Sequence, residues 1–499
     1  MFEGVLSVLA SPVIVFMIFI GVAVGIIFGS IPGLTATMAV TMFLPMTYGM
    51  EPIAAISLLM ALYIGGTSGG LISAILLRIP GTPASVATCF DGHPLAAKGD
   101  AGKALGVGIV FSFLGTLFGL LMMFLIAPAL ADVAIKFGPF EYCALSVFSL
   151  SLVITLTGKD FVRGLMAALL GIVLATVGLA PIDSAKRFTF GFAQMNNGFQ
   201  LLTLLIGLYA MSEILMVAEQ VRDTGRVHID SNVKIKGFGF SLKEFAGQLK
   251  NALYSALIGV GIGILPGIGG GTSGLLSYTF VKNRSKYPGK FGTGVIDGIV
   301  APETANNATI GGAMIPLLTL GIPGDGTTAI LLGALMVHAV SPGPLIFQKN
   351  GPIVYGIYAA MLVASIAVLV LEFWGMRMFV KVLRVPKHYL LPFVVILCCI
   401  GAFGNSNRIF DMWGVLIFGL LGYGMTKGKL PIPPLILGFI LGPMFETNFR
   451  RASQRLTVDS AELFTHPIAN VFVIITILLL IVYLHGRRKN DKQESVSEL

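Results

Sequence analysis

The sequence predicts an all-α polytopic membrane protein, built from two inverted repeats that contain discontinuous helices. The composition predicts the class, because 55% of the 499 residues are hydrophobic and only 11% are charged. Apolar stretches of about 18 residues or more, each able to cross ~30 Å of hydrocarbon, recur along the chain and predict roughly 10 to 13 spans. A helix-breaking motif that occurs in both halves of the chain predicts the repeat.

Five apolar stretches are the best candidates for spans. They cover residues 5–28, 104–130, 201–217, 355–373 and 471–484. No basic region or small-residue cleavage site accompanies the first stretch, so we expect a retained span rather than a signal peptide.

The motif that breaks the apolar sequence contains a Pro-Gly pair and recurs without a gap about half a chain later. A second Pro-Gly pair follows each copy, at residues 80–81 and 323–324. Four breaks at corresponding positions of two halves are typical of secondary transporters, which build a substrate site from broken helices. The matched residues are Gly25 with Gly259, Gly29 with Gly263, Pro32 with Pro266, and Gly33 with Gly267.

Each break frees backbone groups from the helix. Proline lacks an amide hydrogen and clashes with the preceding turn, and glycine permits a sharp change of direction. In hydrocarbon the freed groups must be buried in protein or line a wet cavity. There, helix N-termini favour anions and C-terminal carbonyls favour cations. The alternative is a packing role, since the glycines are spaced by four residues and this spacing also lets two helices approach closely.

The charge distribution predicts the domains and their orientation. Residues 219–250 and 486–499 carry clustered Lys and Arg residues, which favour the cytoplasm. We therefore expect a first membrane repeat over 1–218, a cytoplasmic linker over 219–250, a second repeat with C-terminal spans over 251–485, and a cytoplasmic tail over 486–499. The first ten residues contain no Lys or Arg, so we expect the N-terminus to lie outside and the helix with the first motif to run inward. The helix with the second motif follows the cytoplasmic linker and should run outward. The two motif copies should therefore run in opposite directions.

Hydroxyl and glycine residues gather beside the breaks. Hydroxyl groups and free backbone amides suit a carboxylate, although Ser and Thr also form ordinary hydrogen bonds between membrane helices. Arg78 precedes one break and is a candidate partner for a substrate carboxylate, with snorkelling of its long side chain to the interface as the alternative. The candidate substrate-binding residues are Gly33, Thr35, Thr67, Ser68, Gly69, Arg78, Pro80, Gly81, Thr82, Gly267, Gly270, Thr272, Ser273, Gly324 and Thr327.

The second half adds amide and carboxylate side chains that suit a cation. Asp325 lies inside a break, and carboxylates within membrane segments are commonly functional. Glu303 precedes the Asn306-Asn307 pair and is either a part of the ion site or a helix N-terminal charge. The coupling ion is expected to be sodium or a proton, and no cofactor is expected. The candidate ion-binding residues are Asn306, Asn307, Thr309, Asp325 and Thr328.

Other functional classes fit the sequence less well. The Gly-x-x-x-x-Gly-Lys-[Ser/Thr] loop of an ATP-driven pump does not occur. An intramembrane aspartyl protease needs two neighbouring carboxylates, and Asp325 has no second Asp in a comparably apolar span. The histidines show no His-x-x-x-His pair for zinc, so no enzyme is expected. A carboxylate channel stays open as an alternative.

The motifs resemble those of the large membrane subunit (TctA-type) of the tripartite tricarboxylate transporter family. The resemblance covers most of the chain and is most specific at residues 29–35, 63–83, 90–94, 301–307 and 321–326. It implies uptake of citrate or another carboxylate, driven by an ion gradient, often of sodium, in a bacterial inner membrane. It also implies two partners, a small membrane subunit of about four spans and a periplasmic solute-binding protein. A homodimer is a candidate assembly, and alternating access is the expected mechanism.

Overall fold

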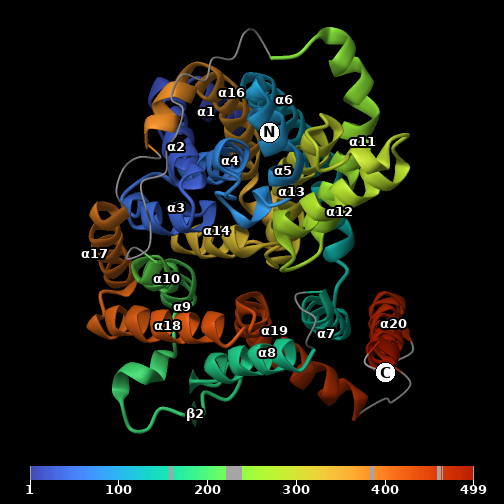
Figure 1. Ribbon diagram of the computed structural model, residues 1–499. Helices are drawn as coiled ribbons and strands as arrows, with labels where there is room; N and C mark the ends of the chain where they lie inside the picture. Colours follow the sequence, from blue (N-terminus) through green and yellow to red (C-terminus); the bar gives the residue numbers. More distant parts are fainter. Residues whose placement is uncertain are drawn as a thin grey trace. The chain divides into compact units, whose positions relative to one another are not determined.

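The computed structural model describes residues 2–156, 161–220, 239–382, 387–457, 462 and 465–497, and within them the chain is almost entirely helical (Figure 1). Strand geometry in these residues is limited to β1 (Gly178–Leu179) and β2 (Lys186–Arg187), which pair in antiparallel orientation. The predicted all-α fold class is therefore confirmed.

The chain forms two compact units, each assembled from segments that are far apart in sequence. The first unit contains residues 1–132, 202–264 and 268–423, and the second contains residues 133–201, 265–267 and 424–499. Both halves of the chain contribute to both units. The two units group residues that are close in space, whereas the predicted repeats are consecutive ranges of the sequence. The predicted repeats therefore stay a prediction.

The helices of the first unit begin and end close to the predicted breaks. They are α1 (Phe2–Leu9), α2 (Pro12–Ser30), α3 (Ala36–Phe43), α4 (Pro52–Leu77), the short 3-10 turn η2 (Pro83–Ser85), α5 (Thr88–Leu95), most of α6 (Ala101–Ala134), α9 (Leu201–Leu205), α10 (Ser212–Gln220), α11 (Leu242–Ile264), α12 (Gly269–Arg284), α13 (Asp297–Leu320), α14 (Gly326–Val337), α15 (Ile346–Lys349), α16 (Gly351–Val382), α17 (Lys387–Ser406) and most of α18 (Ile409–Lys427). The second unit contains α7 (Pro139–Leu156), α8 (Phe161–Ala175), α19 (Ile432–Leu456) and α20 (Pro467–Ser497).

Seven of the described helices are long and apolar enough to cross a membrane, which makes this a multi-pass membrane protein. Six shorter apolar helices accompany them, among them the segments that contain α3 and α14. The predicted number of 10 to 13 spans stays a prediction. The seven long helices are Pro12–Ser30, Pro52–Leu77, Thr88–Ala134, Leu201–Glu219, Gly351–Gly375, Ile409–Lys427 and Ile432–Leu456.

The first predicted span is present but starts later than expected, because residues 5–28 are divided between α1 and α2 and the candidate span begins at Pro12. Ser11 is the N-cap of α2, and its hydroxyl accepts a hydrogen bond from the Ile14 amide at 3.4 Å. Pro12 follows in the first helical turn, where proline loses no helical hydrogen bond and its fixed φ suits a helix start. A new helix therefore begins where hydrophobicity alone indicates continuation. The other four predicted stretches lie within helical segments.

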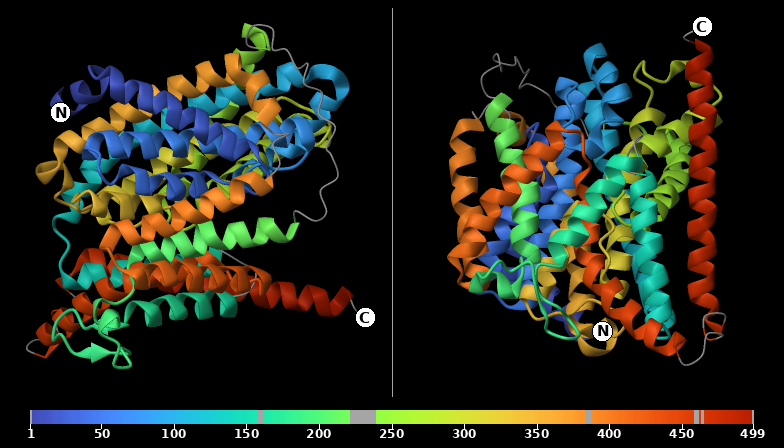
Figure 2. Two further views of the ribbon diagram at one scale, coloured as in Figure 1. Left: turned by 90° about the vertical axis from the view of Figure 1, so that its left-hand side faces the viewer. Right: turned by 90° about the horizontal axis from the view of Figure 1, so that it is seen from below.

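Helices α4 and α13 form the buried centre of the first unit. The most apolar part of α4 is buried completely, and α13 is buried from Asp297 to Thr319 although it contains Pro302 and Pro316. α4 packs against α2, α16 and α3, while α13 packs against α11 and α12 (Figure 2). The polar side chains of α13 are thus surrounded by protein.

The second unit is built on a close crossing of α8 and α19. A Cβ on Gly171 would lie 1.9 Å from a carbonyl oxygen of α19, and a Cβ on Gly438 would lie 2.2 Å from a carbonyl oxygen of α8. Only glycine allows the two backbones to approach this closely. An ion pair between Arg187 and Glu446, with nitrogen and oxygen 2.9 Å apart, adds a polar contact to the same unit.

Candidate functional site

The first predicted break separates α2 from α3. α2 ends at Ser30, and Gly33 has a φ of +88°, which residues with a side chain rarely adopt. Thr35 then starts α3, because its hydroxyl accepts a hydrogen bond from the Met38 amide at 3.1 Å. The cap satisfies one of the amides that the start of a helix leaves free.

The other three predicted breaks are also present. Between α11 and α12, Gly267 has a φ of +74°. α4 ends at Arg78 and α13 ends at Gly321, both in the left-handed conformation with φ of +57° and +70°. α14 starts after Asp325, whose Oδ1 accepts a hydrogen bond from the Thr328 amide at 2.8 Å. Local sequence therefore decides where each helix stops.

Glycines bring α2 and α4 into direct backbone contact. A Cβ on Gly25 would lie 2.5 Å from the Leu62 carbonyl oxygen, and a Cβ on Gly29 would lie 2.1 Å from that of Gly66. The break after α4 packs on the same helix end, since a Cβ on Gly81 would lie 2.1 Å from the Gly29 carbonyl oxygen. A larger residue at any of these three positions would push the backbones apart.

The second half of the chain repeats these three contacts. A Cβ on Gly259 would lie 2.2 Å from the Ala305 carbonyl oxygen, and a Cβ on Gly263 would lie 2.6 Å from that of Thr309. A Cβ on Gly324 would lie 2.4 Å from the Gly263 carbonyl oxygen. α11, α13 and the break after α13 are therefore arranged as α2, α4 and the break after α4 are. The matched contacts define which residue of one half corresponds to which residue of the other.

The broken ends of one half contact those of the other half. The hydroxyl oxygens of Thr37 and Thr327 are 2.8 Å apart, which connects α3 to the start of α14. In the corresponding place, α12 packs against η2, and a Cβ on Gly271 would lie 3.1 Å from the Pro83 carbonyl oxygen. The first unit thus contains two junctions between the halves, which we call the α3–α14 junction and the α12–η2 junction.

Side chains of the protein close the α3–α14 junction. The Tyr63 hydroxyl on α4 donates a hydrogen bond to Asp325 Oδ2. Asp325 Oδ1 accepts from the Thr328 hydroxyl at 2.8 Å in addition to the Thr328 amide. Both oxygens of this carboxylate are therefore satisfied within the protein.

At the α12–η2 junction the corresponding side chains have no partner. By the matched contacts, Asn306 corresponds to Tyr63 and Thr82 corresponds to Asp325. Both polar atoms of the Asn306 amide and Oγ1 of Thr82 lack a hydrogen-bond partner, although the two residues are only 1% and 6% exposed. Leaving a buried polar group unpaired costs about 1–3 kcal/mol, so these atoms are candidates for binding a polar ligand or water.

Asn306 lies directly at this junction. A Cβ on Gly270 of α12 would lie 2.2 Å from Asn306 Oδ1 and 3.5 Å from the Ala84 Cβ of η2. The neighbouring Asn307 donates to a carbonyl oxygen of its own helix at 3.0 Å, but its Oδ1 is unpartnered. We call Thr82, Asn306 and Asn307 the open polar group.

Comparison with known proteins assigns the chain to a family. Residues 15–437 match the family described as Tripartite tricarboxylate transporter TctA family. The chain is 32% identical over 485 residues to the Uncharacterized 52.8 kDa protein in TAR-I ttuC' 3'region of Agrobacterium vitis, which covers 97% of this chain and 96% of that relative. It is 35% identical over 231 residues to the Uncharacterized protein in TAR-II ttuC' 3'region of the same organism, which covers 46% of this chain and 96% of that relative. The chain belongs to the TctA family. No solved structure matches it.

TctA membership makes this chain a membrane subunit of a tripartite tricarboxylate transporter, as its resemblance predicts. Such a system includes a small membrane subunit and a periplasmic binding protein. The family is one of transporters, and the two junctions of broken helices lie in the part of the chain that the family match covers.

Several predicted binding residues of this TctA-family subunit take part in helix packing. Thr67 donates to a carbonyl oxygen of its own helix at 2.9 Å, and a Cβ on Gly69 would lie 2.5 Å from a carbonyl oxygen of α2. Ser273 accepts a hydrogen bond from Thr309 Oγ1 at 2.8 Å, which connects α12 to α13. Their predicted roles in binding stay predictions.

Four other predicted residues are placed differently. Arg78 is exposed at the end of α4, while Pro80 and Thr272 are half-buried. Gly267 belongs to the second unit, where a Cβ would lie 2.9 Å from Val153. From the predicted set, the structure brings Gly270 and Asn306 together beside η2, whose N-cap is Thr82, and it joins Thr327 to Thr37 at the other junction.

Two residues near the breaks escape prediction from the sequence. Tyr63 gives no signal, because one tyrosine among apolar and glycine residues is equally typical of helix packing. Glu372 does give a signal, since it is the acidic residue of the predicted span 355–373. It is fully buried and accepts a hydrogen bond from Ser68 at 3.0 Å, so Ser68 is engaged by a side chain that the predicted site does not contain.

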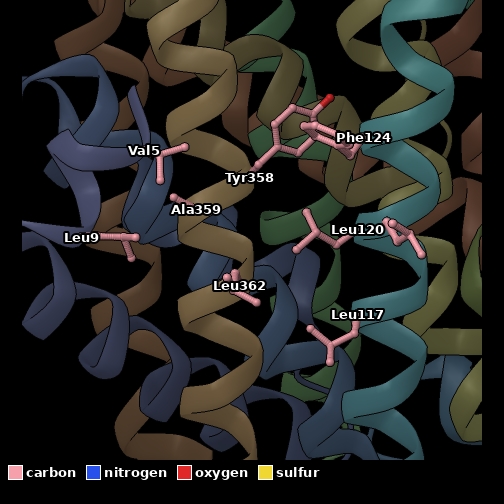
Figure 3. A pocket seen from close by; sticks show the side chains of 9 residues that line it. Val5, Leu9, Leu117, Leu120, Phe124, Tyr358, Ala359 and Leu362 are labelled. Atoms are coloured by element: carbon pink, nitrogen blue, oxygen red, sulfur yellow. The ribbon is translucent and has the colours of Figure 1, made fainter. Parts of the chain in front are cut away.

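An apolar recess of about 310 Å³ lies elsewhere in the first unit. Aliphatic and aromatic side chains from α1, α6 and α16 line it, as Figure 3 shows for Leu9, Leu120 and Phe124. The Tyr358 hydroxyl beside it donates to the Met123 carbonyl oxygen at 3.4 Å. A carboxylate in this recess would lose its hydration without gaining partners, so the recess does not suit the substrate of a carboxylate transporter.

Proposed function

We propose that this subunit carries an organic carboxylate, such as citrate or a related acid, into the cell by alternating access. A periplasmic solute-binding protein would deliver the substrate, and a cation gradient, with sodium as our first choice, would drive uptake. The membrane is a bacterial inner membrane with the C-terminus of the chain in the cytoplasm. The observation that carries this proposal is the open polar group at the α12–η2 junction.

The chemistry of the open polar group suits an anion and a cation together. The Asn306 amide nitrogen and the Thr82 hydroxyl are donors that a carboxylate accepts from. Asn306 Oδ1 and Asn307 Oδ1 are neutral oxygens that suit a cation. Binding both ions at one site lowers the net charge that crosses the membrane. A multiply charged anion without a compensating cation would carry a large free-energy cost in the membrane.

The two junctions support the proposed inverted repeat. Each half contributes one half-helix and one second break, and each half-helix packs on the second break of the other half. A two-fold relation between the halves generates this exchange of contacts. Transporters with such repeats alternate by moving one element against the other around a fixed site.

The test compares two buried threonines whose hydroxyls have no partner. Thr82→Val should lower counterflow of radiolabelled citrate in proteoliposomes by at least about tenfold, because a hydrogen bond to a charged ligand contributes about 1.5–3 kcal/mol. Thr203→Val is the matched control, since Thr203 Oγ1 is also buried without a partner but lies on α9. The membranes should contain the small subunit.

The outcome separates the carrier from the alternatives. Equal counterflow in both variants would remove the open polar group from the substrate path. A channel would give a different result. Labelled carboxylate would then flow down its own gradient, whether or not unlabelled carboxylate is present on the opposite side.

A further inference from the structure

A carboxyl group that the substrate site does not use lies at the centre of the first unit. Glu372 is on α16, within the apolar span Gly351–Gly375, and it is 0% exposed. Ser68 Oγ of α4 donates to Glu372 Oε2 at 3.0 Å, whereas Oε1 has no partner. A fully buried acid with one unpartnered oxygen requires an explanation.

The first unit contains a second buried carboxyl group. It belongs to Glu303 on α13, which is 1% exposed. Its two oxygens accept hydrogen bonds from the hydroxyls of Thr88 on α5 and Ser112 on α6, the latter at 2.9 Å. Glu303 is therefore better solvated by the protein than Glu372, which has one hydroxyl donor.

No described cationic side chain forms an ion pair with either carboxyl group. α2, which packs on α16, contains no titratable residue, and α4 contains Tyr63, whose hydroxyl donates to Asp325. The titratable residues on the other packed helices lie toward helix ends: Glu3 on α1, Lys349 on α15, Lys103 and Asp132 on α6. Lys349 precedes α16 and is about six turns of helix from Glu372. Tyr355 and Tyr358 on α16 itself face α15 and α6.

A bare carboxylate in this place would lose its hydration without a cation to compensate for it. One proton removes this cost, because a carboxylic acid is neutral. A metal ion would need several converging oxygens, whereas the hydroxyls of Thr88 and Ser112 are already directed at Glu303. A proton needs only one lone pair, and the unpartnered Oε1 of Glu372 supplies it.

We propose that Glu372 is a proton-carrying residue of the transport cycle, and that Ser68 positions it. A proton from the periplasmic side binds Oε1 as the protein adopts the state seen here, and the O–H bond breaks when the group reaches cytoplasmic water. The proton gradient thus contributes to carboxylate uptake beside any sodium ion at the open polar group. This inference rests on the proposed function.

The test measures two activities of the complete membrane complex in proteoliposomes. Wild type should show counterflow of labelled carboxylate and also accumulation driven by an inside-alkaline pH gradient without sodium. Glu372→Gln, which keeps the neutral shape, should retain counterflow but lose this accumulation to the level of empty liposomes. Glu141→Gln is the control, because Glu141 is a buried acid of the second unit with its own partners, Gly138 N and His466.

Each result decides one of the two proposals. Absence of counterflow in wild type would contradict the proposed carrier function itself. Counterflow without pH-driven accumulation in wild type, or equal accumulation in Glu372→Gln, would overturn the proton role. Should Glu372→Gln fail to reach the membrane, Glu372→Asp keeps the carboxyl group but withdraws it from Ser68. It should shift the pH dependence of accumulation while counterflow remains, and an unchanged pH dependence would count against the proposal.

Discussion

The two junctions of the first unit have the same backbone construction but different side chains. At the α3–α14 junction, Tyr63 reaches Asp325 and every carboxylate oxygen is satisfied. At the α12–η2 junction, Asn306 and Thr82 stand in the same places without partners. The difference teaches that the two halves build the same backbone geometry twice, while the described side chains satisfy one copy and leave polar atoms of the other without a partner.

The comparison also changes how the site divides between the halves. The sequence predicts hydroxyls of both halves for the anion and amides of the second half for the cation. The structure places Asn306 of the second half beside Gly270 and near Ala84 of the first half. Each junction therefore contains residues from both halves of the chain.

The largest effect is expected where a second break packs on a helix end. Gly81→Val and Gly324→Val should both abolish carboxylate counterflow, because their Cβ atoms would lie 2.1 and 2.4 Å from a carbonyl oxygen. Such overpacking costs about 1–3 kcal/mol or more. Gly261→Val on α11 is the control, since nothing lies within 4 Å of its Cβ position. Near-normal transport in either variant would contradict the claim that the two halves make equivalent contacts.

A smaller but more selective effect is expected inside the junctions. Asn306→Leu should lower counterflow by about tenfold or more, because it removes both the donor and the acceptor. Tyr63→Phe should keep most of the counterflow and lower thermal stability by about 1–3 kcal/mol, since it leaves a carboxylate oxygen of Asp325 unpaired. If Tyr63→Phe is the more damaging for transport, the closed junction is the functional one.

Asp325→Asn tests whether the closed junction takes part in ion coupling. Asparagine is also a good N-cap, so α14 should persist and the protein should remain in the membrane. Loss of the charge should weaken the dependence of uptake on sodium or on pH by a few-fold, because a cation near the carboxylate would lose attraction. The measurement is the initial uptake rate against sodium concentration at two pH values. Unchanged coupling would remove Asp325 from the ion site.

The smallest effect concerns Glu244, which lies in the predicted cytoplasmic linker. The hydrogen bond from Lys103 lowers the pKa of Glu244 from 4.5 to about 2. The folded protein thus binds this proton less readily than the unfolded chain. The contribution to stability is full above pH 4.5 and is lost as the pH falls toward 2. The pair is partly exposed, so at most about 1 kcal/mol is involved. Unfolding curves of Glu244→Gln and wild type should converge at acidic pH, and a constant difference would contradict this account.

The sequence predicts the breaks well because their causes are local. Gly33 supplies the positive φ of the turn. Thr35 caps α3 through a hydrogen bond from the amide of Met38, only three residues later in the chain. The partners of Tyr63 and Thr82 depend instead on how segments from opposite halves meet, which no local pattern contains. Arg78 shows the same limit, since its place before a break suggests a ligand while the fold leaves it exposed at a helix end.

The glycine contacts of the two halves restrict how the protein can move. Each pair, α2 with α4 and α11 with α13, meets through carbonyl oxygens set against missing side chains. A slip of one residue along either pair would drive a Cβ into a carbonyl oxygen. We therefore expect each pair to move as one rigid body in any conformational change. Relative movement of helices is expected instead where side chains, rather than bare backbones, separate them.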